Sequence, residues 1–68
     1  MEDNIRTFVK HTTLGTIERE MRFTNDGLHA HLYTVFPLNG TETYDGTIER
    51  QYEHAQALEW KDFGFIEV

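Results

Sequence analysis

Four histidines are the side chains of this 68-residue chain best suited to acid–base or metal chemistry at neutral pH: His11, His29, His31 and His54. On a β-strand the rings of His29 and His31 would project from one face about 6.6–7 Å apart, a spacing that suits two ligands of one metal ion. A third ligand would have to come from another histidine or an acid. We favour the alternative that these are half-exposed strand residues, because two histidines separated by one residue are weak evidence of a site. A His-based metal-binding regulator is kept as an alternative function.

Covalent catalysis finds little support in the composition. The chain has no serine and no cysteine, so threonine is the only remaining source of the usual hydroxyl or thiol nucleophile. Glu18 and Glu20 would flank one strand face, but without apolar burial nothing raises the pKa of either carboxyl group. The five glycines are isolated from one another, so no phosphate-binding loop is predicted. We therefore expect a protein that is not an enzyme and that uses no cofactor.

The formal net charge of −6 is unevenly distributed. Residues 1–40 carry five acids and four bases, whereas residues 41–68 carry seven acids and two bases. Direct binding to nucleic acid is not expected, because affinity for phosphates comes from clustered Lys and Arg. A protein partner with a basic surface is the better match. The simpler interpretation is that negative charge keeps a small domain in solution.

Aromatic side chains would supply the apolar part of a partner site. Most are expected in the core, because a small domain must bury its large side chains to offset chain entropy. On a helix Trp60 lies roughly 200° from Leu58, so the two cannot face the same core, and an exposed Trp60 beside Phe63 would contact a partner or a second copy of the chain. The predicted partner-binding residues are Glu42, Tyr44, Asp45, Glu49, Glu53, Glu59, Trp60 and Asp62.

Turn signals divide the first part of the chain into strands. The candidate turns are Leu14-Gly15, Asn25-Asp26-Gly27, Asn39-Gly40 and Asp45-Gly46. The segments 5–13, 16–24 and 28–38 between them have strand composition. In the second segment we expect Ile17, Met21 and Phe23 to share a face with the aliphatic stem of Arg19.

The hydrophobic period changes after Arg50. Tyr52, Ala55 and Leu58 recur near helical spacing, which predicts a helix over residues 53–62. The apolar segment 65–68 that follows a glycine is predicted to return as an edge strand. The expected fold is therefore a single α+β domain over residues 1–68, with a small antiparallel meander of three to four strands, one C-terminal α-helix and a short final edge strand.

The pentapeptide Gly-Thr-Ile-Glu-Arg occurs twice, at residues 15–19 and 46–50. The flanking sequences do not match, and the second copy leads into the helical segment, so we do not expect a structural duplication. We favour a local solution shared by both copies over a remnant of duplication. In that solution the glycine closes a turn, Thr and Ile begin the next strand, and Glu and Arg face opposite sides.

These observations favour a small acidic binding protein that inhibits a nucleic-acid-handling protein, of the kind that phages and mobile elements encode. The N-terminus lacks the pattern of a secretory signal, and no segment approaches the ~20 apolar residues of a membrane span. We therefore expect no membrane association and a cytoplasmic location, in a host cell if the protein is phage-encoded. The alternative is a structural or accessory homodimer that pairs through the open edge of its sheet.

Overall fold

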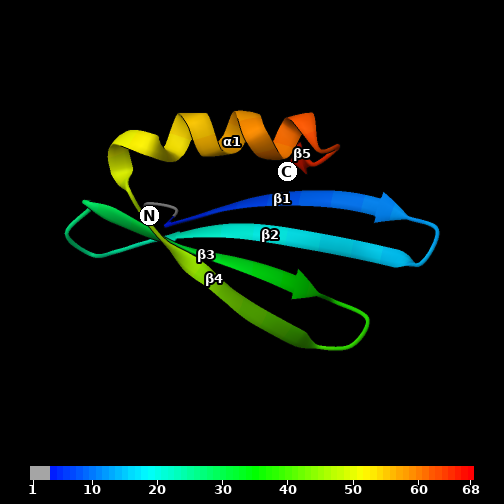
Figure 1. The fold of residues 1–68 in the computed structure, drawn as a ribbon. Coiled ribbons are helices and arrows are strands. Elements are labelled where there is room, and N and C mark those ends of the chain that lie inside the picture. The colour runs from blue at the N-terminus through cyan, green and yellow to red at the C-terminus, as the bar shows by residue number, and fades with distance from the viewer. Residues whose placement is uncertain (1–3) are drawn as a thin grey trace.

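Within residues 4–68 five antiparallel strands form one sheet in the order β4-β3-β2-β1-β5, and one α-helix crosses one face of it (Figure 1). This is a computed structural model that describes residues 4–68, so two of the acids counted above, Glu2 and Asp3, lie outside the described residues. The elements are β1 (Ile5–Thr12), β2 (Gly15–Phe23), β3 (His29–Phe36), β4 (Thr41–Glu49), the 3-10 helix η1 (Arg50–Tyr52), α1 (Glu53–Asp62) and β5 (Ile66–Glu67). The α+β class, the meander, the helix bounds and the final edge strand are confirmed.

Side chains close the first two turns. Thr12 Oγ1 accepts a hydrogen bond from the Leu14 amide at 3.1 Å and donates to the Gly15 carbonyl at 2.7 Å. In the second turn Asp26 Oδ1 accepts from the Leu28 amide at 3.0 Å, and the hydroxyl of Thr24 also donates to it. These two bonds, the Thr24 hydroxyl first, hold the pKa of Asp26 below its usual value.

The turn predicted at Asp45-Gly46 is not formed, because β4 runs straight through it. Leu32 pairs with Gly46 while Tyr33 pairs with Tyr44, which leaves Asp45 as the extra residue of a β-bulge. Gly46 has a φ of 127°, a conformation that residues with a side chain rarely adopt. The Asp-Gly pair therefore did signal an unusual backbone, but a bulge uses it here instead of a turn.

The core lies between α1 and the sheet. Seven apolar side chains are buried among the described residues: Phe8, Met21, Ala30, Leu32, Ala57, Trp60 and Phe65. The Phe8 and Trp60 rings meet edge to face, with centroids 5.1 Å apart and an interplanar angle of 74°. The guanidinium of Arg19 lies 5.0 Å from the centroid of the Phe65 ring and 5.8 Å from that of Trp60. The predicted placement of the Arg19 stem on the core face of β2 is confirmed.

The predicted orientation of α1 is wrong. Trp60 is only 4% exposed, whereas Leu58 is 48% and Tyr52 54% exposed. The inward face instead carries Glu53, Gln56, Ala57 and Trp60, which are the less exposed positions of the helix. Trp60 occupies the buried position because burying its side chain removes more apolar surface from water than burying Leu58 would. The small Ala57 allows the helix to approach the sheet.

The helix is shorter than the sheet that it covers. Ten helical residues span about 15 Å, whereas a nine-residue strand spans about 30 Å. The ends of the strands that carry the β1–β2 and β3–β4 turns therefore extend beyond α1 (Figure 1). On that part of the sheet the core face has no helix over it.

We predict that Trp60→Ala lowers the free energy of unfolding by about 3–5 kcal/mol, because it removes the ring that packs α1 against Phe8. Leu58→Ala, two residues away on the outward side, should cost less than about 1 kcal/mol. Urea unfolding followed by far-UV circular dichroism measures both. Equal losses in the two variants would contradict the buried position of Trp60.

Candidate protein-interaction surfaces

The structure does not bring the four histidines together. His29 and His31 share the open face of the sheet, which we define as the face turned away from α1, as their spacing predicts. His11 lies near the other end of the sheet, where β1 pairs with the start of β2, and His54 lies on α1. Among residues 4–68 no group of three or more His, Cys, Asp or Glu is placed to hold a metal ion.

The two copies of the repeated pentapeptide make the same kinds of contact. Each threonine faces a histidine across the ladder: Thr16 Oγ1 lies 3.1 Å from His11 Nδ1, and Thr47 Oγ1 lies 2.7 Å from His31 Nδ1. The isoleucine of each copy packs against the core. Each arginine lies over a phenylalanine ring, in the second copy at 4.3 Å from the ring centroid. The predicted local solution holds for the first copy but is wrong for the second, where the glycine lies in the bulge and closes no turn, and Thr47 and Ile48 end β4 instead of beginning a strand.

Four of the eight predicted partner-binding residues lie together on β4: Glu42, Tyr44, Asp45 and Glu49. β4 is an edge strand of the described sheet, since β3 is its one partner among residues 4–68. All four residues are exposed, and the strand sequence TETYDGTIE contains no basic residue. We call these four residues the acidic edge.

The charges of the acidic edge are only partly neutralised. The Arg22 guanidinium donates to both carboxylate oxygens of Glu42, at 2.7 and 3.3 Å, and holds the pKa of Glu42 below its usual value. Asp45 accepts a hydrogen bond from the Thr34 hydroxyl, and Glu49 accepts one from the Gln51 side-chain amide. Within residues 4–68 neither Asp45 nor Glu49 forms a salt bridge, so both charges are available to a partner.

Aromatic surface adjoins Glu42 on the open face, whereas Asp45 bonds to Thr34, which alternates with Leu32 on the core face. The Tyr44 ring lies 5.6 Å from the Tyr33 ring and 6.0 Å from the His31 ring, measured between centroids. The Tyr44 hydroxyl bonds to the hydroxyl of Thr47, and the Arg22 guanidinium lies 3.9 Å from the centroid of the Tyr33 ring. Tyr44 remains 55% exposed and so offers an amphipathic contact next to the acids.

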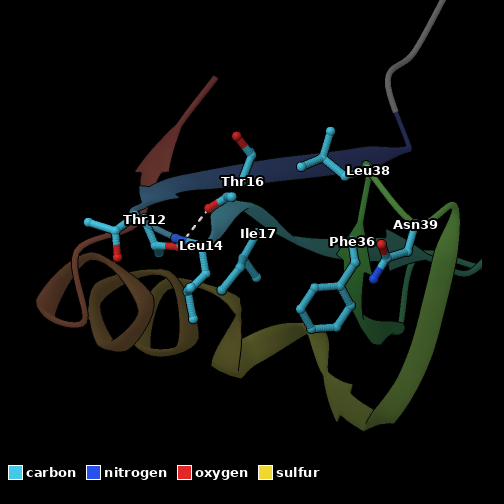
Figure 2. A pocket seen from close by; sticks show the side chains of 9 residues that line it. Thr12, Leu14, Thr16, Ile17, Phe36, Leu38 and Asn39 are labelled. Atoms are coloured by element: carbon cyan, nitrogen blue, oxygen red, sulfur yellow. Dashed lines mark hydrogen bonds between the residues drawn. The ribbon is translucent and has the colours of Figure 1, made fainter.

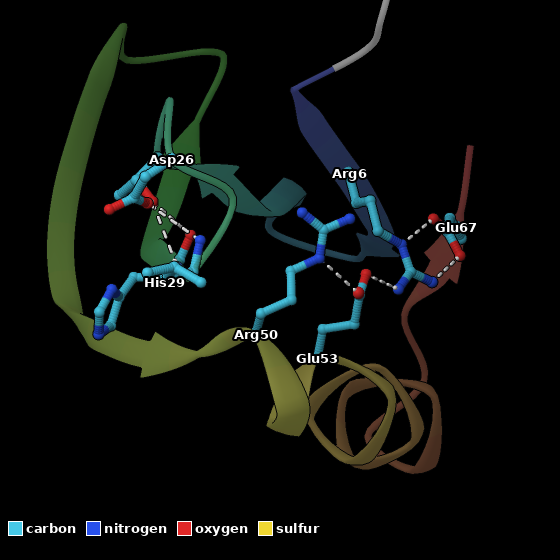
Figure 3. Close-up of polar contacts among 8 residues, drawn as sticks. Arg6, Asp26, His29, Arg50, Glu53 and Glu67 are labelled. Atoms are coloured by element: carbon cyan, nitrogen blue, oxygen red, sulfur yellow. Dashed lines mark hydrogen bonds and ion pairs between the residues drawn. The ribbon is translucent and has the colours of Figure 1, made fainter.

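The other four predicted residues lie on α1 and do not act alike. Trp60 is buried in the core, so its predicted role as a partner contact is wrong. Glu53 turns inward and accepts hydrogen bonds from Arg6 and from Arg50, both at 3.0 Å (Figure 3). Glu59 and Asp62 are exposed on the helix. The helical acids therefore divide between an internal ion pair and an exposed pair of charges.

A half-buried ion-pair network fastens β5 to the rest of the sheet. Arg6 donates to both oxygens of Glu67 at 2.7 Å and to Glu53 at 3.0 Å (Figure 3). The hydrogen bonds from Arg6 hold the pKa of Glu67 below its usual value. Sequence reasoning missed this network, because the two partners of Arg6 lie 47 and 61 residues away along the chain.

An apolar groove opens where the sheet extends beyond α1 (Figure 2). Its volume is about 370 Å³, and none of its lining residues is charged. Leu14, Ile17, Phe36 and Leu38 supply the apolar lining, which threonines, a glycine and Asn39 complete. Leu14 is 96% and Leu38 80% exposed. Sequence reasoning missed the groove, although two leucines placed at turns were a signal of it.

Comparison with known protein families, curated proteins and solved structures finds no match to this chain. No helix in the part of the chain that the structure describes is long and apolar enough to cross a bilayer. On the surface of residues 4–68 the acidic edge and the apolar groove contrast in chemistry, one charged and the other without charge.

We predict that Glu67→Gln flattens the acid side of the stability profile. The folded-state pKa of Glu67 is lowered, so its contribution is complete above the ordinary glutamate value of about 4.3 and is lost as pH falls through the folded pKa. The variant should lose about 0.5–1 kcal/mol of unfolding free energy at neutral pH and less at acid pH. Urea unfolding between neutral and acid pH measures this, with Glu59→Gln as the exposed control. Wild-type and Glu67→Gln curves that stay parallel would contradict it.

Proposed function

We propose that this chain is a small non-enzymatic binding protein that attaches to a basic surface of a protein partner through its acidic edge. The observation that carries the proposal is the gathering of Glu42, Tyr44, Asp45 and Glu49, all exposed, on an edge strand without a basic residue. Two of these acids, Asp45 and Glu49, retain charges that no base neutralises within residues 4–68. A partner with clustered Lys or Arg supplies the missing positive charge.

The acids and the aromatic ring of the acidic edge would contribute to different steps of binding. The acids steer the encounter and raise the association rate, whereas the exposed Tyr44 ring prolongs the complex once it has formed. Tyrosine suits this role because it offers a large, rigid surface with one polar end.

The partner class that best fits this chemistry is a nucleic-acid-handling protein, whose basic binding groove needs an anionic surface to occupy it. The chain would inhibit such a protein by covering that groove, in the cytoplasm of the cell that contains both. This class follows from charge and size, in the way that small phage and mobile-element inhibitors act.

We predict that Asp45→Asn combined with Glu49→Gln weakens partner binding about tenfold, mainly through the association rate. Glu59→Gln combined with Asp62→Asn changes the net charge by the same two units on α1 and should have a smaller effect. The partner is isolated by affinity capture from a nuclease-treated lysate, purified, and measured by surface plasmon resonance at low and high salt. Equal losses in the two double variants, or affinity that does not change with salt, would contradict binding through the acidic edge.

A further inference from the structure

We propose that two copies of this chain form a symmetric dimer through the apolar groove, with Leu14 of each copy seated in the groove of the other. This inference uses a different surface from the acidic edge and does not depend on the partner proposed above. It rests on the mismatch between helix and sheet, on the chemistry of the lining and on the exposed leucines at its border.

The groove exists because α1 ends before the sheet does. Ile17 and Phe36 belong to the core face of β2 and β3, in the same alternation as the buried Met21 and Leu32. Over the middle of the sheet that face is covered by α1, whereas at Ile17 and Phe36 it opens into the groove (Figure 2). A second layer is therefore missing over an apolar part of the sheet.

The absence of charged residues from the groove lining favours a second copy of this chain over a basic partner as the occupant. A basic partner would find no acid there, since none of the lining residues is charged. Because the lining carries no acid, two copies of a chain with a net charge of −6 meet less repulsion at the groove than they would at the acidic edge. The acidic edge is the opposite case, because pairing β4 with a second β4 would bring together two strands that carry acids and no base.

The groove is also complementary to itself. Leu14 is 96% exposed at its border, while the space beside it is about 370 Å³, enough for a leucine side chain (Figure 2). A two-fold axis brings the same patch of both copies together, so each protruding leucine can enter the opposite recess. The same contact would remove Leu38, 80% exposed, from water.

A dimer would also enlarge the small apolar core of this domain. Seven buried residues among those described are a small core, and association is one of the ways in which chains of this length add stability. Filling the groove extends the apolar layer from the region below α1 to the ends of the strands. The groove is incomplete without the second copy.

Sedimentation equilibrium of the wild-type chain over a wide concentration range tests the proposal. We expect a monomer–dimer equilibrium that strengthens at high salt, because salt screens the repulsion between two acidic chains. Binding through the acidic edge should instead weaken at high salt, so failure of one proposal is distinguishable from failure of the other. Leu14→Glu should weaken the dimer by roughly 100-fold or more. In a two-fold symmetric dimer the leucine contact occurs twice, so the substitution removes both copies of it.

Leu58→Glu is the matched control, since it adds the same charge at a leucine that is 48% exposed on the outward side of α1. It should leave dimerisation within about threefold of wild type. Leu38→Glu is a second groove variant, and circular dichroism with thermal unfolding verifies that each variant is folded. A wild-type chain that is monomeric at every concentration, or a dimer that Leu14→Glu and Leu38→Glu leave intact, would overturn the proposal. A monomer whose partner binding is abolished by Leu14→Glu would assign the groove to that partner.

Discussion

The packing of Trp60 on Phe8 is the contact on which the rest of this fold depends. It is the point where a helix from the last third of the chain meets the strand that begins the meander. Because α1 is anchored there, the Phe65 amide can bond to the Trp60 carbonyl at 3.0 Å and turn the chain back toward β1. The short β5, with Glu67 beside Arg6, follows from that return. Both the covered and the uncovered part of the sheet are set by where this helix lies.

Local sequence was sufficient for the elements but not for their orientation. The bounds of α1 and the strands of the meander follow from hydrophobic period and turn residues, which act over a few positions. The inward side of α1 depends on what the sheet offers opposite it, and no pattern within residues 53–62 contains that information. Glu53 shows the difficulty, since this inward acid is paired both with Arg50, three residues before it, and with Arg6, 47 residues away along the chain.

The candidate surfaces were predictable to unequal degrees. Grouping acids by position in the chain identified the acidic edge, because Glu42 to Glu49 lie on one strand. The same grouping failed for α1, where Trp60 is internal and Glu53 is paired. The apolar groove joins two turns that are far apart in sequence, at Leu14 and Leu38, so it emerges only once the sheet has brought them together.

The bulge in β4 has a consequence for the behaviour of the protein at high concentration. An edge strand of nine residues with a regular backbone would present a continuous row of unpaired amides and carbonyls, which is a template for the stacking of chains into fibrils. Asp45, as the extra residue opposite the Leu32–Tyr33 step, interrupts that row and adds a charge at the interruption. One inserted residue thus leaves the strand with its exposed side chains while making its backbone a poor nucleus for aggregation.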